Sequence, residues 1–118
     1  MIISFTIDGP PVPKPRPRPG RKFFISKRAK DYQEHVGYCA MGTVFPDEWP
    51  AKNGRFNVHL LCFFGDQRVR DLDNVAKSVL DGMNKLVWAD DGQVDRLVVD
   101  RRFDKERPRV EVEISAWA

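Results

Sequence analysis

The fold of this chain is decided by residues 55–86, which read RFNVHLLCFFGDQRVRDLDNVAKSVLDGMNKL. Apolar residues alternate from Phe56 to Cys62, and this period of two predicts a partly covered β-strand over residues 55–64. After a break at residues 65–68, apolar residues recur at helical spacing and predict a helix from about Leu72 or Asp73 to Leu86. A strand followed so soon by an amphipathic helix indicates a sheet with helices packed on it.

The flanking segments extend this pattern over the whole chain of 118 residues. Residues 2–7, 94–102 and 108–115 predict further strands, and residues 23–25 predict a short one. Ser26 can cap a helix from about Lys27 to Met41 or Gly42, while residues 43–54 predict a loop. The main elements, in the order β–α–β–α–β–β, predict a mixed α/β (α+β) fold. We expect a single compact domain over residues 1–118, with one mixed β-sheet and two main helices packed on it.

The composition argues against a membrane protein and against a secreted, disulfide-rich protein. No apolar run approaches the roughly 20 residues that cross a bilayer, and the apolar start lacks a basic leader and a cleavage site, so we expect no membrane partner. Cys39 and Cys62 have neither the spacing of a CxxC motif nor the density of a secreted disulfide scaffold. They predict reduced thiols in an intracellular protein.

Charge is distributed unevenly along the chain. The net charge is only +3, but residues 1–30 carry +7 and residues 31–118 carry −4. Within the basic part, residues 9–22 contain six prolines, which exclude a helix or a central strand and predict an extended loop. A basic arm beside a carboxylate-rich body suits phosphodiester hydrolysis, because phosphates bind cations and hydrolysis uses a metal held by anions.

Aspartates gather around the predicted second helix. Asp71 and Asp73 stand two residues apart at its start, where their side chains can point to the same side, and Lys77 follows four residues later on one helix face. Asp90 and Asp91 come after the helix and can rejoin the first pair only if the fold closes on itself. Carboxylates hold Mg²⁺, and a lysine adds charge near a phosphate. Spacing alone equally allows an N-cap, a helix-dipole contact and an ordinary turn.

Two ordered motifs carry a resemblance to a known family. The first is Arg70-Asp71-Leu72-Asp73-Asn74 with Lys77 three residues later, and it is followed by Asp81; the second is Trp88-Ala89-Asp90-Asp91-Gly92-Gln93-Val94. Together they strongly resemble the RusA family of Holliday junction resolvases. The resemblance extends to the N-terminal strand, the basic loop, the first helix and the closing strand. The chain departs from the family in its segment 13–19, where alternating prolines and basic residues replace an asparagine-bearing segment, which puts junction geometry and base preference in doubt.

The resemblance implies a crossover junction endodeoxyribonuclease: a homodimer that binds four-way DNA junctions and resolves them by paired symmetric nicks, in recombination and repair. It implies Mg²⁺ as cofactor, with Mn²⁺ as a substitute, and a cytoplasmic protein of bacterial or phage origin. By position, Asp71, Asp73 and Asp91 would bind the metal and Lys77 would be the catalytic cation. Asp90 is a weaker metal candidate, because it can equally be a solvated turn residue.

The basic residues are candidates for DNA contact. This set comprises Lys14, Arg16, Arg18, Arg21, Lys22, Lys27, Arg68 and Arg70. The stiff arm would lose little entropy on binding, although a solvated loop is the alternative, and Arg70 can instead pair with a neighbouring carboxylate. Trp88 is expected to anchor the core or an interface. Two other functions stay open: a junction-binding protein without nuclease activity, and a metal-dependent nuclease for other branched DNA or RNA.

Overall fold

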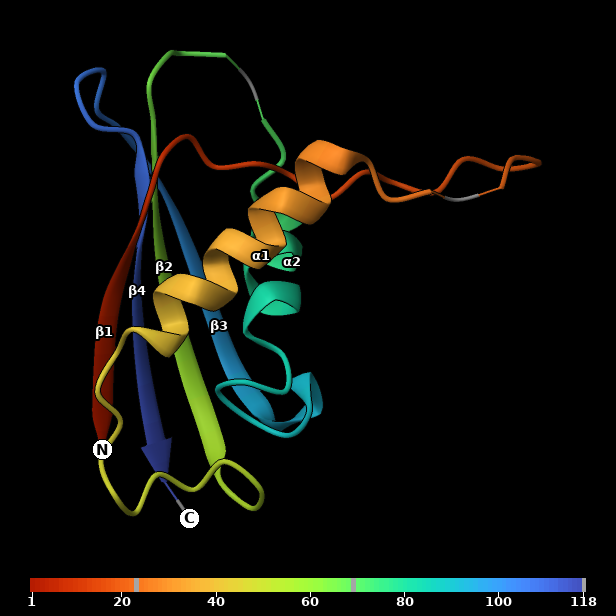
Figure 1. The fold of residues 1–118 in the computed structure, drawn as a ribbon. Helices are drawn as coiled ribbons and strands as arrows, with labels where there is room; N and C mark the ends of the chain where they lie inside the picture. Colours follow the sequence, from red (N-terminus) through yellow and green to blue (C-terminus); the bar gives the residue numbers. More distant parts are fainter. Residues whose placement is uncertain (23, 69, 118) are drawn as a thin grey trace.

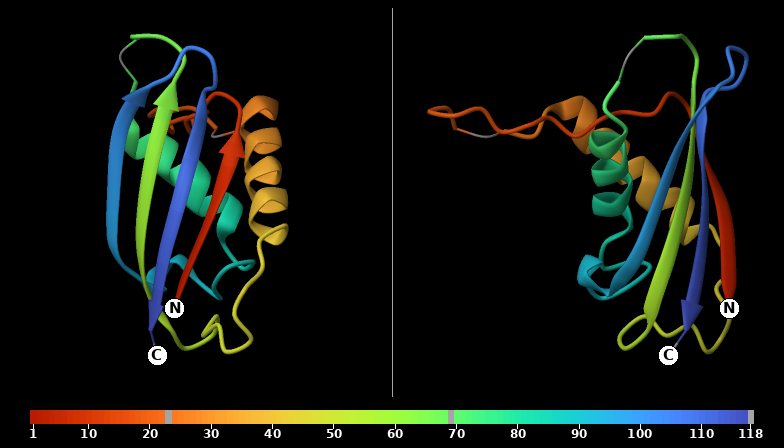
Figure 2. Two further views of the ribbon diagram at one scale, coloured as in Figure 1. Left: turned by 90° about the vertical axis from the view of Figure 1, so that its left-hand side faces the viewer. Right: turned by 180° about the vertical axis from the view of Figure 1, so that it is seen from behind.

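The fold consists of one β-sheet with both long helices on the same face (Figures 1 and 2). The structure is a computed structural model, and it describes residues 1–22, 24–68 and 70–117. Along the chain the elements are β1 (Ile2–Asp8), α1 (Lys27–Met41), β2 (Arg55–Phe64), α2 (Leu72–Met83), the short 3-10 helix η1 (Asp91–Gln93), β3 (Val94–Phe103) and β4 (Arg109–Trp117). The predicted α+β domain is thereby confirmed.

The sheet is mixed and has the strand order β1-β4-β2-β3. Strands β1 and β2 run antiparallel to β4, whereas β2 and β3 run parallel. The parallel pair follows from the connection, because α2 carries the chain back along the sheet before β3 begins. The same connection carries both aspartate motifs, the first at the start of α2 and the second between α2 and β3.

The core lies between the sheet and the two helices. The predicted alternation in β2 is confirmed, since Phe56, Val58, Leu60 and Cys62 are buried and the residues between them are partly exposed. Ser26 caps α1 as predicted, with its hydroxyl oxygen accepting a hydrogen bond from the backbone N–H of Ala29 at 3.2 Å. The uncovered face of the sheet carries the half-exposed side chains.

The two helices approach each other closely at a glycine of α2. A Cβ at Gly82 would lie 2.7 Å from the backbone oxygen of Gln33 and 2.7 Å from the Cβ of Val36, both in α1. Only a residue without a side chain allows this approach. The crossing brings Asp81, the neighbour of Gly82, within hydrogen-bond range of the Gln33 side chain at 3.5 Å.

The predicted end of α2 and the predicted short strand before α1 were both wrong. Helix α2 ends at Met83 rather than Leu86, because Asn84 leaves the helical region (φ −58°, ψ 134°) and Lys85 has a positive φ of 67°. The departure turns the chain so that Trp88 is buried and packs on Phe56, with ring centroids 5.1 Å apart. The predicted short strand at residues 23–25 does not form over residues 24 and 25, which belong to no strand and are exposed. Its first residue lies outside the described residues.

No helix among the described residues is long and apolar enough to cross a membrane.

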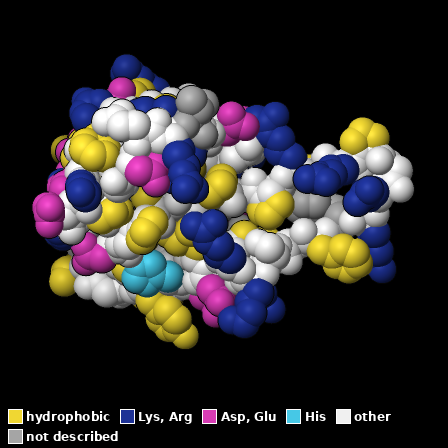
Figure 3. Space-filling model, turned by 90° about the horizontal axis from the view of Figure 1, so that it is seen from above, with side chains coloured by type: hydrophobic (Ala, Val, Ile, Leu, Met, Phe, Trp, Pro, Cys, Tyr) yellow, Lys and Arg dark blue, Asp and Glu magenta, His cyan; other side chains and the backbone are white. Residues whose placement is uncertain are grey.

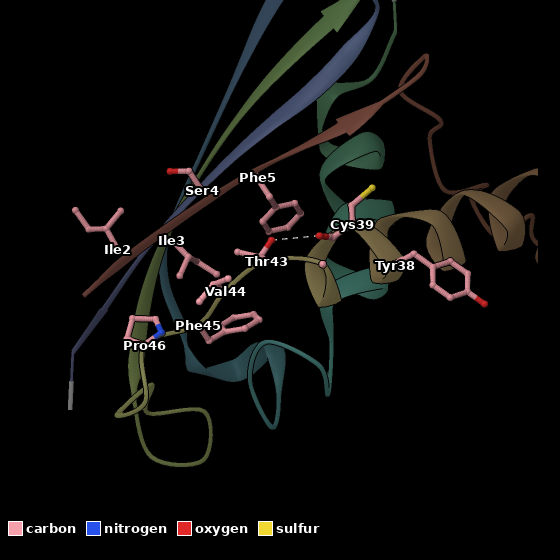
Figure 4. Close-up of a pocket in the computed structure, with 11 residues that line it drawn as sticks. Ile2, Ile3, Ser4, Phe5, Tyr38, Cys39, Thr43, Val44, Phe45 and Pro46 are labelled. Carbon is pink, nitrogen blue, oxygen red and sulfur yellow. Dashed lines mark hydrogen bonds between the residues drawn. The ribbon is translucent and has the colours of Figure 1, made fainter.

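A groove of about 680 Å³ runs between β1 and residues 38–46, with apolar side chains such as Ile3, Phe5 and Phe45 on its walls (Figure 4). None of the candidate aspartates lines this groove, so it is separate from the site described next.

Candidate active site

Asp71 and Asp73 lie at the first turn of α2 with their carboxylates open to solvent. Asp71 occupies the N-cap position, yet its side chain makes no capping hydrogen bond in the described structure. Its Oδ2 instead accepts hydrogen bonds from Arg16 Nη2 at 2.7 Å and from Asn74 Nδ2 at 3.3 Å. The same Arg16 nitrogen lies 3.7 Å from Oδ1 of Asp73. The two carboxylates therefore share one cation, and neither is committed to capping the helix.

Asp91 is held at the other motif by a buried tryptophan. Trp88 Nε1 donates a hydrogen bond of 2.7 Å to Oδ1 of Asp91. Partial burial raises the pKa of the Asp91 carboxyl; the Trp88 hydrogen bond opposes this, and the negative charges of Asp81 and Asp90 add to it. Trp88 is thus a core anchor, as one of the two alternatives predicted, and it also orients Asp91, a role that the sequence did not reveal.

Asp90 is engaged in building the turn. Its carboxylate accepts a hydrogen bond from the Gly92 N–H at 2.8 Å, while its own N–H donates to the side-chain oxygen of Gln93 at 2.9 Å. This reciprocal capping box starts η1. Gln93 Nε2 also donates to the carbonyl oxygens of Ala51 and Gly54, each at 3.0 Å. These bonds favour the turn role for Asp90 over metal binding, and they fix the backbone that presents Asp91.

Asp81 follows the first motif in the sequence, where it carried no assigned role, and the structure makes it a further functional candidate. It forms an ion pair with Lys14, in which Nζ and Oδ2 are 2.7 Å apart and both side chains are about one third exposed. It also lies near enough to Asp91 to influence the pKa of that carboxyl. Its position four residues after Lys77, on the same side of a helix, was the available signal. The Lys14–Asp81 pair cannot be found from spacing, because 67 residues separate the partners.

The proline-rich arm crosses α2 at its base and then projects away from the body (Figures 1 and 3). The backbone N–H of Lys14 donates to the carbonyl oxygen of Asn74 at 2.9 Å, which fixes the base on α2. Arg18, Arg21 and Lys22 lie on the exposed outer part, with Lys22 Nζ 5.5 Å from the ring centre of Phe24. The structure thus splits the basic arm into a part bound to the aspartates and a part directed into solvent.

The other predicted DNA-binding residues, Lys27, Arg68 and Arg70, lie outside the arm. Lys27 pairs with Asp31 at 2.7 Å on the surface of α1. Arg70 pairs with Asp66 at 2.6 Å, as the alternative for this residue foresaw, and this hydrogen bond lowers the pKa of the Asp66 carboxyl to about 2. Arg68 and Arg70 line one hollow on the surface, so this region is basic despite the internal pair.

The candidate carboxylates form two groups along α2. Asp71 and Asp73 stand at its N-terminal end, whereas Asp81 stands roughly 15 Å further along, ten residues after Asp71. Asp91 follows α2 in η1, near enough to Asp81 to feel its charge. Lys77 is exposed between the two groups. Among the described residues, no three histidine, cysteine, aspartate or glutamate side chains come together closely enough to hold a metal ion.

The donor chemistry of the first group nevertheless suits a divalent metal. Asp71 and Asp73 offer hard carboxylate oxygens to solvent, and a cation, Arg16, already lies against both. Oxygen donors of this kind match Mg²⁺, which retains several waters and needs only one or two protein carboxylates besides the substrate phosphate. Asp71 and Asp73 therefore fit the role of metal ligands, although the part of the chain that the structure describes gathers no third carboxylate with them closely enough for a metal ion.

Comparison with known proteins identifies the family. No curated protein matches the chain. The family profile described as Endodeoxyribonuclease RusA matches residues 8–115, a stretch that includes the arm, both carboxylate groups, both long helices and strands β2 and β3. The chain therefore belongs to the RusA family of endodeoxyribonucleases, Holliday junction resolvases that hydrolyse DNA.

Proposed function

We propose that this chain is a Mg²⁺-dependent resolvase that cuts four-way DNA junctions by paired symmetric nicks during recombination and repair. Family membership establishes an endonuclease that acts on branched DNA, of a kind that in general depends on a divalent metal. The observation that carries the more specific proposal is the open pair of carboxylates on α2. Asp71 and Asp73 accept a cation from the arm rather than capping the helix.

In this proposal Asp71 and Asp73 hold the metal, which when bound would neutralise charge on the phosphate and lower the pKa of an attacking water. Lys77 lies one helical turn after Asp73 and is exposed, so its ammonium group can stabilise negative charge that develops on the phosphate. The outer arm residues Arg18 and Arg21 are available for the DNA backbone on either side of the cut.

We propose further that the active unit is a homodimer in which Asp91 completes the site of the partner copy. Paired cuts on a two-fold branched substrate call for two equivalent sites, which a C₂ dimer supplies. Within one chain Asp71 begins α2, whereas Asp91 lies after α2 in η1, where the Trp88 hydrogen bond holds it. We infer that a second copy brings its Asp91 to Asp71 and Asp73, because the described residues of one chain do not gather a third carboxylate with this pair closely enough for a metal ion.

The test of the metal site is the Asp71→Asn variant, which keeps the size of the side chain but removes its charge. We expect this variant to bind a synthetic four-way junction normally and to lose Mg²⁺-dependent nicking. Equal nicking by wild type and variant would remove Asp71 from the mechanism. Cleavage rates of the wild type on a junction, a flap, duplex DNA and a hairpin RNA separate a resolvase from a nuclease for other branched substrates. Tight binding without nicking in Mg²⁺ or Mn²⁺ would indicate a junction-binding protein instead.

A further inference from the structure

We infer that Arg16 is an internal placeholder for the metal, and that it couples the binding of metal to the binding of DNA. This inference rests on the proposed function, since it assigns a new role at the same carboxylates. In the structure, the guanidinium group of Arg16 lies 2.7 Å from Asp71 and 3.7 Å from Asp73, the two proposed metal ligands. A metal that arrives alone must displace this group.

The structure provides a fixed pivot for such a displacement. Lys14, two residues before Arg16, is tied to α2 by a backbone hydrogen bond to Asn74 and by the ion pair with Asp81. The Lys14 side chain is one third exposed, whereas that of Arg16 is 62% exposed and has solvent on most sides. The base of the arm can therefore stay in place while the Arg16 side chain changes partner.

The phosphate backbone of the bound DNA is the natural second partner. A guanidinium group binds a phosphate in the same two-pronged way that it binds a carboxylate. The proposed site must place a phosphate next to the metal, and Arg16 already lies beside the metal ligands. When DNA binds, Arg16 moves to a phosphate, and the carboxylates become free for the metal. Because such coupling is reciprocal, the metal must then favour DNA binding by the same factor.

The expected size of the coupling follows from the solvent exposure of the Arg16–Asp71 ion pair. Exposed ion pairs are weak, so the release of Arg16 accounts for a coupling of about twofold to fivefold rather than an absolute requirement. A small effect of this kind is measurable only against a matched variant. Arg18 is such a control, because it lies two residues further along the same arm and forms no ion pair with a carboxylate in the described structure.

The experiment compares Arg16→Gln with Arg18→Gln in the full chain, using binding rather than cleavage as the readout. Mn²⁺ binding is measured by the electron paramagnetic resonance signal of the free ion, with and without a four-way junction whose cleavage sites carry phosphorothioates. Junction binding is measured by fluorescence anisotropy with Ca²⁺ and with chelator. Thermal unfolding of each variant verifies that the fold is intact.

We expect both variants to bind the junction more weakly, because each loses a cation. Only Arg16→Gln should bind Mn²⁺ about twofold to fivefold more tightly than wild type in the absence of DNA. The junction should strengthen Mn²⁺ binding less in Arg16→Gln than in wild type, and the difference should be that same factor. Arg16→Lys should stay close to wild type. If Arg16→Gln binds Mn²⁺ as Arg18→Gln does, Arg16 is not a placeholder. That result would leave the metal-dependent resolvase intact, whereas metal coupling without any junction cleavage would overturn the proposed resolvase and not this inference.

Discussion

A mixture of two inactive variants, Asp71→Asn and Asp91→Asn, is expected to recover strand nicking. The expectation follows because Asp71 begins α2 while Asp91 lies after it in η1, and the described residues of one chain bring no three carboxylates together for a metal ion. If Asp71 of one copy works with Asp91 of its partner, each single variant carries a defect in both sites of its own dimer. In the mixed dimer both defects fall in the same site, and the other site has a full set of carboxylates.

The size of the recovery can be worked out from this arrangement. After full exchange of subunits, about half of the dimers are mixed, and each has one intact site of two, so the nicking rate should reach about a quarter of that of wild type. Because only one strand can be cut in each mixed dimer, the product should be a nicked junction rather than a pair of resolved duplexes.

The assay uses a synthetic junction labelled on each of the four strands in turn, with products separated on denaturing and native gels. The two variants are mixed in equal amounts after brief incubation in mild denaturant, and each variant taken through the same treatment alone is the control. Nicking of the mixture that does not exceed the two separate controls would refute the shared site. It would show that Asp91 acts within its own chain or has no role in the reaction.

Three further predictions concern single residues. Asp90→Ser retains a capping oxygen and should keep nicking within about twofold of wild type, whereas Asp91→Asn should abolish it; junction cleavage in Mg²⁺ measures both. Gly82→Ala should lower the free energy of unfolding by about 1–3 kcal/mol, because its Cβ would lie 2.7 Å from the backbone of α1, while Gly42→Ala, with 3.5 Å to its nearest neighbour, should stay near wild type in urea unfolding. Burial raises the pKa of the Cys62 thiol from 9.0 to about 12, so the native state keeps a proton that the unfolded state loses. Stability should therefore fall as the pH rises from 9 toward 12, by up to about 1.4 kcal/mol per pH unit for this group, and Cys62→Val should make the decline shallower in urea unfolding at pH 8 to 11.

Local patterns were sufficient to predict most of the fold. The alternation in β2 and the helical spacing in α2 depend on residues that are close in sequence, and both were confirmed. The cap of α1 at Ser26 was predictable for the same reason. The end of α2 was not, because burial of Trp88 against Phe56, 32 residues earlier in the chain, decides where the helix stops. Periodicity up to Leu86 carries no information about that contact.

The candidate site divides in the same way. The residue types and spacing of Asp71, Asp73 and Lys77, together with the second motif, were sufficient to name these side chains as candidates for the chemistry. Only the tertiary structure decided their surroundings: Arg16 against the first two carboxylates, and Asp91 beside Trp88 at the other end of α2. Such contacts join residues far apart in the chain, and their geometry depends on how the whole sheet and both helices pack.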